Sequence, residues 1–191
     1  MVRSSDANRG KIRIAPDMPG LDENRPFIPV GIAVLTVSDT RTRAEDKSGD
    51  VLEARIGEAG HRLEARTIVP DDRARIYEQV KAWTLDAAID VVITTGGTGF
   101  TGRDVTPEAL EPLFEKRMDG FSAVFHRISY DKIGTSTIQS RATAGVANAT
   151  FIFVLPGSPG ACKDAWDGIM PHSYSSYPAR PAPARTPGTA S

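Results

Sequence analysis

The chain of 191 residues carries 23 Lys and Arg against 24 Asp and Glu, a formal net charge of -1 at pH 7. This balance provides no bulk attraction toward nucleic acid or an anionic membrane, so any binding of phosphate must be local. A hydrophobic content of 40% is enough for one sizeable core, and no apolar stretch is long enough to cross a bilayer. The single cysteine cannot form an internal disulfide, which suits a cytoplasmic protein.

The two ends of the chain differ from its middle. Residues 1–26 carry charges, Gly and Pro without an apolar period, which predicts a flexible arm. Residues 171–191 are rich in Pro, Ala, Ser and Thr and predict a tail that contributes little to folding. We therefore expect one domain over residues 27–170.

The first half of this domain alternates apolar runs with helical patterns. Residues 30–37 (VGIAVLTV) are almost continuously apolar, as a strand covered on both faces should be. A helix is expected to start near Ser48 and to end at Gly60, and residues 63–69 predict a second strand. After Pro70, one helical face is predicted to hold Ile76, Val80, Trp83 and Ala87.

The second half continues the alternation. Buried strands are predicted at residues 90–95 and 150–155, and helices at residues 107–116, 121–132 and 159–170. Strands that alternate with helices predict an α/β fold of three layers, α/β/α, with a mostly parallel central sheet.

In such sheets ligands bind at the carboxyl ends of the strands, so the loops after the strands are candidate sites. The second of three unusual loops, residues 95–109, begins with Gly96, Gly97 and Gly99 directly after a strand. Glycines there let backbone amides approach the oxygens of a phosphate, although glycine spacing alone fits a plain tight turn equally well. We call residues 96–99 the glycine turn.

Two common nucleotide motifs do not describe this loop. A GxGxxG pattern ends at Gly102, yet the helix is delayed, with Thr106 as its expected cap and Pro107 as its first residue. The triphosphate loop that ends in Gly-Lys is missing, because no lysine follows these glycines. Arg103 and Asp104 remain as a charged pair between the turn and the helix.

Asp71 is a second carboxylate at a strand end. It can cap the following helix, and Asp72 is an equal candidate for that role. Alternatively, Asp71 and Asp104 can hold magnesium beside phosphate oxygens, because this metal takes one or two carboxylates together with substrate phosphates.

Several long motifs carry a resemblance to a known family. The segments SDTRTRAEDKSGDVL, IVPDD, VVITTGGTGFTGRDVTPEAL, GFSAVFHRISYDKIGTSTIQSRATAG and FIFVLPGSPGACKDAW occur in this order. Together they resemble the molybdenum cofactor biosynthesis protein B family, which is similar to bacterial molybdopterin adenylyltransferases and to a domain of gephyrin. The match runs from about residue 30 to residue 169.

The resemblance implies a trimer or a pair of trimers that transfers AMP from MgATP to the phosphate of molybdopterin, releasing pyrophosphate. It implies Asp71 and Asp104 as the catalytic and magnesium-binding residues. The remaining residues that the resemblance implies for the substrate and nucleotide site are Ser38, Asp39, Gly96, Gly97, Thr98, Gly99, Arg103, Ser140, Gly157, Ser158 and Pro159. Other proteins of the cofactor pathway are further expected partners. The alternative is a catalytically silent paralogue that binds molybdopterin or serves as a scaffold.

The other reactive side chains predict structural roles. His61, His126 and His172 are not spaced as a ligand cluster. Cys162 is expected to be a small buried side chain, although the start of a helix can lower a thiol pKa.

Overall fold

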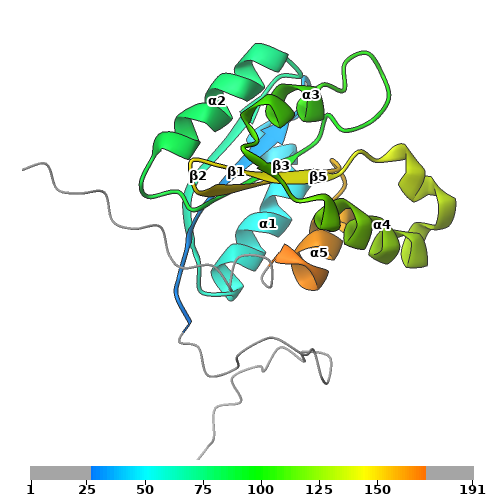
Figure 1. Ribbon diagram of the computed structural model, residues 1–191. Helices are drawn as coiled ribbons and strands as arrows, with labels where there is room; N and C mark the ends of the chain where they lie inside the picture. Colours follow the sequence, from blue (N-terminus) through cyan, green and yellow to red (C-terminus); the bar gives the residue numbers. More distant parts are fainter. Residues whose placement is uncertain (1–26, 171–191) are drawn as a thin grey trace, which may run out of the picture.

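A sheet of six strands forms the middle layer of the computed structural model, which describes residues 27–170 (Figure 1). The strand order is β2-β1-β3-β6-β5-β4. The predicted α/β fold of three layers is confirmed, whereas the predicted arm and tail lie outside the described residues.

Four of the strands are parallel and lie side by side. They are β2 (Arg62–Val69), β1 (Gly31–Val37), β3 (Val91–Thr95) and β6 (Thr150–Leu155). Each coincides with one of the predicted strands. Strands β1, β3 and β6 are buried along their whole length, because helices cover both faces of the sheet.

Two antiparallel strands, which the sequence did not predict, extend the sheet at one edge. They are β5 (Thr143–Ala147), which pairs with β6, and β4 (Lys116–Arg117), which pairs with β5. The hairpin between β5 and β6 turns through Asn148 and Ala149, which have φ values of 47° and 59°. Two left-handed residues in succession are typical of the tight turns that join twisted antiparallel strands.

Helices cover the two faces of the sheet. One face holds α1 (Lys47–Glu58), α4 (Asp119–Ile133) and α5 (Pro159–Gly168), whose apolar side chains surround Trp166. The other holds α2 (Arg73–Leu85) and α3 (Thr106–Leu110), which pack around Trp83. Short 3₁₀ turns occur at Arg43–Glu45, Glu111–Leu113 and Gly134–Gln139.

Two predicted helix ends are wrong. The helix expected over residues 107–116 ends at Leu110, passes into a 3₁₀ turn and then enters β4. Pro112 explains the early end, because proline lacks the N–H of a helix interior and its ring clashes with the preceding turn. Helix α2 stops at Leu85, so Ala87 is exposed beyond it and does not share the face of Trp83.

Two helix starts differ in detail from those predicted. Helix α1 begins at Lys47, one residue before Ser48, and its cap is Asp46, whose side chain accepts a hydrogen bond from the backbone N–H of Gly49. Thr106 is the first residue of α3 and not its cap. Its hydroxyl instead donates to the carbonyl oxygen of Gly96 at 2.9 Å.

A buried ion pair ties α1 to the sheet. The carboxylate of Asp46 accepts from Arg66 at 2.7 Å and from the hydroxyl of Thr36 at 2.8 Å. The side chains of Asp46 and Arg66 are 0% and 4% exposed. Removing one partner of such a pair leaves the other charge buried without full compensation.

Replacing Asp46 by Ala should therefore lower the free energy of unfolding by about 3 kcal/mol, measured by urea denaturation followed by circular dichroism. Asp50→Ala is the matched control, because Asp50 lies 2.9 Å from the same guanidinium but is 56% exposed. The control should lose about 1 kcal/mol or less. Equal losses in the two variants would show that burial of the pair does not determine its contribution.

Candidate functional site

The carboxyl ends of the parallel strands meet at one edge of the sheet. Thr36 lies opposite Thr95, and Thr95 lies opposite Leu155, so the loops that follow β1, β3 and β6 begin side by side. The chain leaves β1 in one direction and β3 in the other, the arrangement at which open α/β sheets bind ligands. This edge carries nearly all of the site residues expected from the sequence.

The glycine turn requires its first two glycines. Gly96 and Gly97 have φ values of 106° and 62°, in the left-handed region that side chains disfavour. A Cβ on Gly96 would collide with the carbonyl oxygen of Val37. A Cβ on Gly97 would collide with the hydroxyl of Thr106 and lie 2.5 Å from Oδ1 of Asp71. The turn therefore lies directly against the end of β1 and against Asp71.

Asp71 does not cap α2. Asp72 does so, accepting from the backbone N–H of Arg75 at 2.8 Å. Oδ1 of Asp71 is buried and has no hydrogen-bond partner within the described part of the chain. Burial, followed by the negative charges of Asp39 and Asp104, raises the pKa of the Asp71 carboxyl, and Arg103 opposes the rise. Of the two roles left open for Asp71, the structure excludes the capping one.

Asp104 is held very differently. Its Oδ2 accepts from the hydroxyl of Thr101 at 2.6 Å and from the backbone N–H of Thr101 at 3.0 Å. These bonds, with a further one from the backbone N–H of Gly99, lower the pKa of the Asp104 carboxyl. Asp104 thus stabilises the loop that contains it.

Three arginines contact the loops of this edge. Arg103 forms an ion pair with Asp39, whose other oxygen accepts from the backbone N–H of Asp71 at 3.2 Å. Arg141 donates to the carbonyl oxygens of Thr98 and Asp104 at 3.1 and 2.7 Å and forms an ion pair with Glu108. It therefore joins the two ends of the segment that carries Asp104.

The third arginine, Arg41, donates to the carbonyl oxygen of Gly157 at 3.1 Å. Ser48 donates to the same oxygen at 2.8 Å. Ser38 accepts from the backbone N–H groups of Thr40 and Arg41, at 3.4 and 3.2 Å, and so shapes the loop after β1. Neither Arg41 nor Arg141 was among the site residues expected from the sequence.

The remaining expected residues have mixed outcomes. Ser158 caps α5, accepting from the backbone N–H of Ala161 at 3.1 Å, and Pro159 is the first residue of that helix. Ser140 immediately precedes Arg141, and its hydroxyl is a second buried oxygen without a partner in residues 27–170. Thr98 is buried and reaches Arg141 through its carbonyl oxygen.

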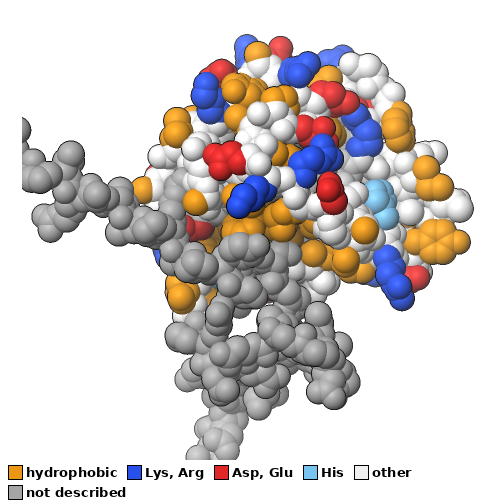
Figure 2. Space-filling view, viewed as in Figure 1, with side chains coloured by type: hydrophobic (Ala, Val, Ile, Leu, Met, Phe, Trp, Pro, Cys, Tyr) orange, Lys and Arg blue, Asp and Glu red, His pale blue; other side chains and the backbone are white. Residues whose placement is uncertain are grey.

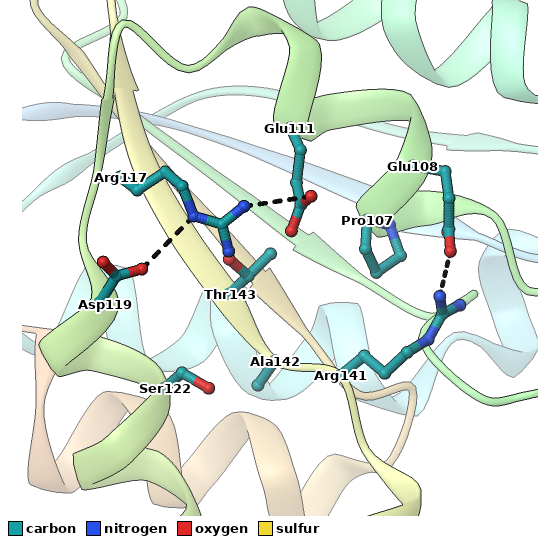
Figure 3. Close-up of a pocket in the computed structure, with 9 residues that line it drawn as sticks. All are labelled: Pro107, Glu108, Glu111, Arg117, Asp119, Ser122, Arg141, Ala142 and Thr143. Atoms are coloured by element: carbon teal, nitrogen blue, oxygen red, sulfur yellow. Dashed lines mark hydrogen bonds and ion pairs between the residues drawn. The ribbon is translucent and has the colours of Figure 1, made fainter.

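A separate hollow of about 400 Å³ lies beside α3 and contains none of the expected site residues. Figure 3 shows Arg117 between Glu111 and Asp119, and Arg141 pointing toward Glu108. Acidic and basic side chains also alternate over the face seen in Figure 2. Because the arginines of the hollow are already paired with carboxylates, we place the candidate site at the loops instead.

Within the described residues, neither the cysteine nor the histidines are placed to act as a nucleophile at this edge. Cys162 is fully buried, as expected, and burial raises the pKa of its thiol to about 11. His61 accepts from the backbone N–H of Val30, and His126 bonds to Thr137, which confirms structural roles for both. His172 lies outside the described residues.

Within residues 27–170, no cluster of three or more His, Cys, Asp or Glu is arranged as a metal site. None of the helices in that range combines the length and the apolar composition that crossing a membrane requires.

Comparisons with known proteins agree with this architecture. The domain family described as "Probable molybdopterin binding domain" matches residues 33–173. Molybdenum cofactor biosynthesis protein B of Escherichia coli K12 is 50% identical over 144 residues, which are 75% of this chain and 85% of that protein. The protein of the same name from Bacillus subtilis is 46% identical over 138 residues, covering 72% and 81% of the two chains.

A crystal structure of molybdenum cofactor biosynthesis protein B superposes with a TM-score of 0.74 at 41% identity, covering 76% of this chain and 91% of the other. On the sequence match and the fold, the chain belongs to the molybdenum cofactor biosynthesis protein B family.

Proposed function

We propose that this member of the molybdenum cofactor pathway transfers AMP from MgATP to the phosphate of molybdopterin. The observation that carries the proposal is the buried, unpartnered Oδ1 of Asp71 against the glycine turn. A buried carboxylate oxygen without a hydrogen bond is costly, so its retention beside two further carboxylates points to a cationic ligand.

The proposed reaction needs no nucleophile from the protein. An oxygen of the molybdopterin phosphate, already ionised at neutral pH, forms a bond to the α-phosphorus of ATP while the bond to pyrophosphate breaks. Catalysis of such a displacement consists mainly of positioning and neutralisation of charge. Burial of Cys162 and the structural roles of His61 and His126 are in keeping with this chemistry.

The carboxylates fit a magnesium ion that arrives with the nucleotide. Magnesium is bound by one or two carboxylates plus substrate phosphates rather than by an all-protein cage. Asp71 has an oxygen free to serve as a ligand, and the second oxygen of Asp104, Oδ1, is not used by Thr101. We therefore infer that these two aspartates position the MgATP substrate, with the ion pair of Asp39 and Arg103 beside Asp71.

The direct test is incubation of the full chain with molybdopterin and MgATP. The expected products are adenylylated molybdopterin and pyrophosphate in equal amounts. Tight binding of molybdopterin without release of pyrophosphate would instead identify a silent scaffold of the same fold. A cytoplasmic location stays a prediction from the single cysteine.

We also propose that the protein is a homo-oligomer, a trimer or a pair of trimers. The support in the structure is a set of large apolar side chains left exposed on and after α4, where Tyr130 and Ile133 are each 56% exposed and Ile138 is 68% exposed. Exposed apolar side chains gathered on one surface are typical of protein interfaces.

Asp71→Asn should reduce adenylyl transfer by on the order of a hundredfold or more, because it removes the charge and preserves the shape. It should not destabilise the protein, since Oδ1 accepts no hydrogen bond. A raised pKa means that the carboxyl stabilises the fold below its ordinary value of 3.8 and loses that contribution as the pH rises through the folded-state value. At neutral pH the melting temperature of the variant should therefore equal or exceed that of the wild type.

Asp104→Asn should lose activity by a similar factor, but its effect on stability should have the opposite sign. A lowered pKa means that the carboxylate stabilises the fold above its ordinary value of 3.8, and the contribution disappears as the pH falls through the folded-state value. The variant should melt below the wild type at neutral pH, and the difference should shrink in acid. A rate within about threefold of wild type, measured per folded molecule, would remove Asp104 from the catalytic residues.

Light scattering at micromolar concentration should give a mass three or six times the 20.5 kDa of the chain. Ile138→Asp should shift this mass toward that of the monomer, because a charge at an apolar contact opposes association. A wild-type mass near 20.5 kDa at all concentrations would contradict the oligomer.

A further inference from the structure

The three arginines at the loops differ in whether a carboxylate neutralises their charge. Arg103 is paired with Asp39, and Arg141 is paired with Glu108. Arg41 forms no ion pair with any carboxylate of residues 27–170, and its guanidinium donates to a neutral acceptor, the carbonyl oxygen of Gly157. Of these three arginines, Arg41 alone brings a positive charge that the loops do not neutralise.

The side chain of Arg41 lies beside the glycine turn. A Cβ on Gly157 would be 3.2 Å from Cα of Gly96 and 4.0 Å from Nη1 of Arg41, so all three groups share one small region. Because Gly157 has no side chain, it does not separate the guanidinium of Arg41 from the glycine turn. Arg41 therefore lies on the β6 side of the glycine turn, whereas Asp71 lies against the turn at Gly97.

Arg41 is held in place from both ends. Its backbone N–H donates to the hydroxyl of Ser38 at 3.2 Å, and its Nη2 donates to the carbonyl oxygen of Gly157. Arginine has five N–H donors in a planar fork, and this arrangement uses one of them. The others remain for a ligand, and the fork matches the oxygens of a phosphate group.

We propose that Arg41 is a phosphate-binding residue of the site and that it holds an oxygen of the substrate's phosphates against the glycine turn. The inference rests on the proposed function and names the basic side chain that offsets the negative charge of the loops. Asp39, Asp71 and Asp104 together with Arg103 leave the loops net negative, which repels phosphate, and the net charge of -1 offers no compensating field. Arg41 supplies positive charge at the turn itself, in addition to the magnesium that ATP brings.

The test is calorimetric titration of the full chain with inorganic pyrophosphate, without substrate turnover. Arg41→Gln should weaken this binding by roughly tenfold to a hundredfold, since a charge-assisted bond is lost. The affinity of Arg41→Lys for pyrophosphate should lie between those of the wild type and Arg41→Gln, because lysine keeps the charge but not the planar fork of donors. Arg43→Gln is the matched control: Arg43 lies on the same loop but pairs with Asp50 and Glu53, and the change should leave binding unaltered.

The source of the phosphate follows from steady-state kinetics of Arg41→Gln. A raised KM for ATP identifies the nucleotide, and a raised KM for molybdopterin identifies the pterin phosphate. The melting temperature of each variant shows that it is folded, and Arg41→Lys remains informative if the Gln variant is not.

Failure of the inference differs from failure of the proposed function. Pyrophosphate bound by the wild type and lost in Arg41→Gln supports the phosphate-binding role even if no adenylyl transfer is found. Pyrophosphate bound equally by folded wild type and Arg41→Gln, or by neither, overturns that role even if the transfer is observed.

Discussion

The register of the four parallel strands is the constraint on which the site depends. Thr36, Thr95 and Leu155 lie opposite one another at the ends of three strands that are buried on both faces. A slip of one residue would turn every side chain of a strand to the opposite face, so packing against both helical layers fixes the register. The same packing therefore decides where the loops that contain Ser38, Gly96 and Gly157 begin. Core packing and site geometry are not separable in this fold.

Asp104 and Asp71 lie in the same group of loops but have opposite effects on the stability of the fold. Asp104 accepts hydrogen bonds from Thr101 and contributes to the fold as a carboxylate. Asp71 faces like charges with one oxygen unpartnered, so its ionised form opposes folding. A fold selected for stability alone has no physical reason to keep such a group. Because a cation placed between the carboxylates would reverse the repulsion, the unfavourable energy in the free protein becomes favourable binding energy in the complex.

Much of the fold was predictable because β1, β2, β3 and β6 are continuous or alternating apolar runs. Strand β5 was missed because its sequence, TAGVA, is short and its hairpin has Ala149 where glycine usually marks the turn. The motifs indicated Asp71 and the glycine turn, but spacing could not decide between Asp71 and Asp72 as the cap. Arg41 and Arg141 could not be found, since their partners lie 116 and 43 residues away in the sequence.

The part of the sheet that sequence patterns did not reveal also positions the loop that contains Asp104. Residues 98–104 have no regular structure, and Arg141 joins their two ends through the carbonyl oxygens of Thr98 and Asp104. Arg141 stands two residues before β5, whose backbone is fixed by its antiparallel pairing with β6. Strand β6 ends at Leu155, two residues before Gly157, whose carbonyl oxygen accepts a hydrogen bond from Arg41. The strand that pairs with β5 therefore also positions the loop that contacts Arg41. The pairing of β5 with β6 therefore fixes the position of Arg141, and through Arg141 the position of the loop that contains Asp104.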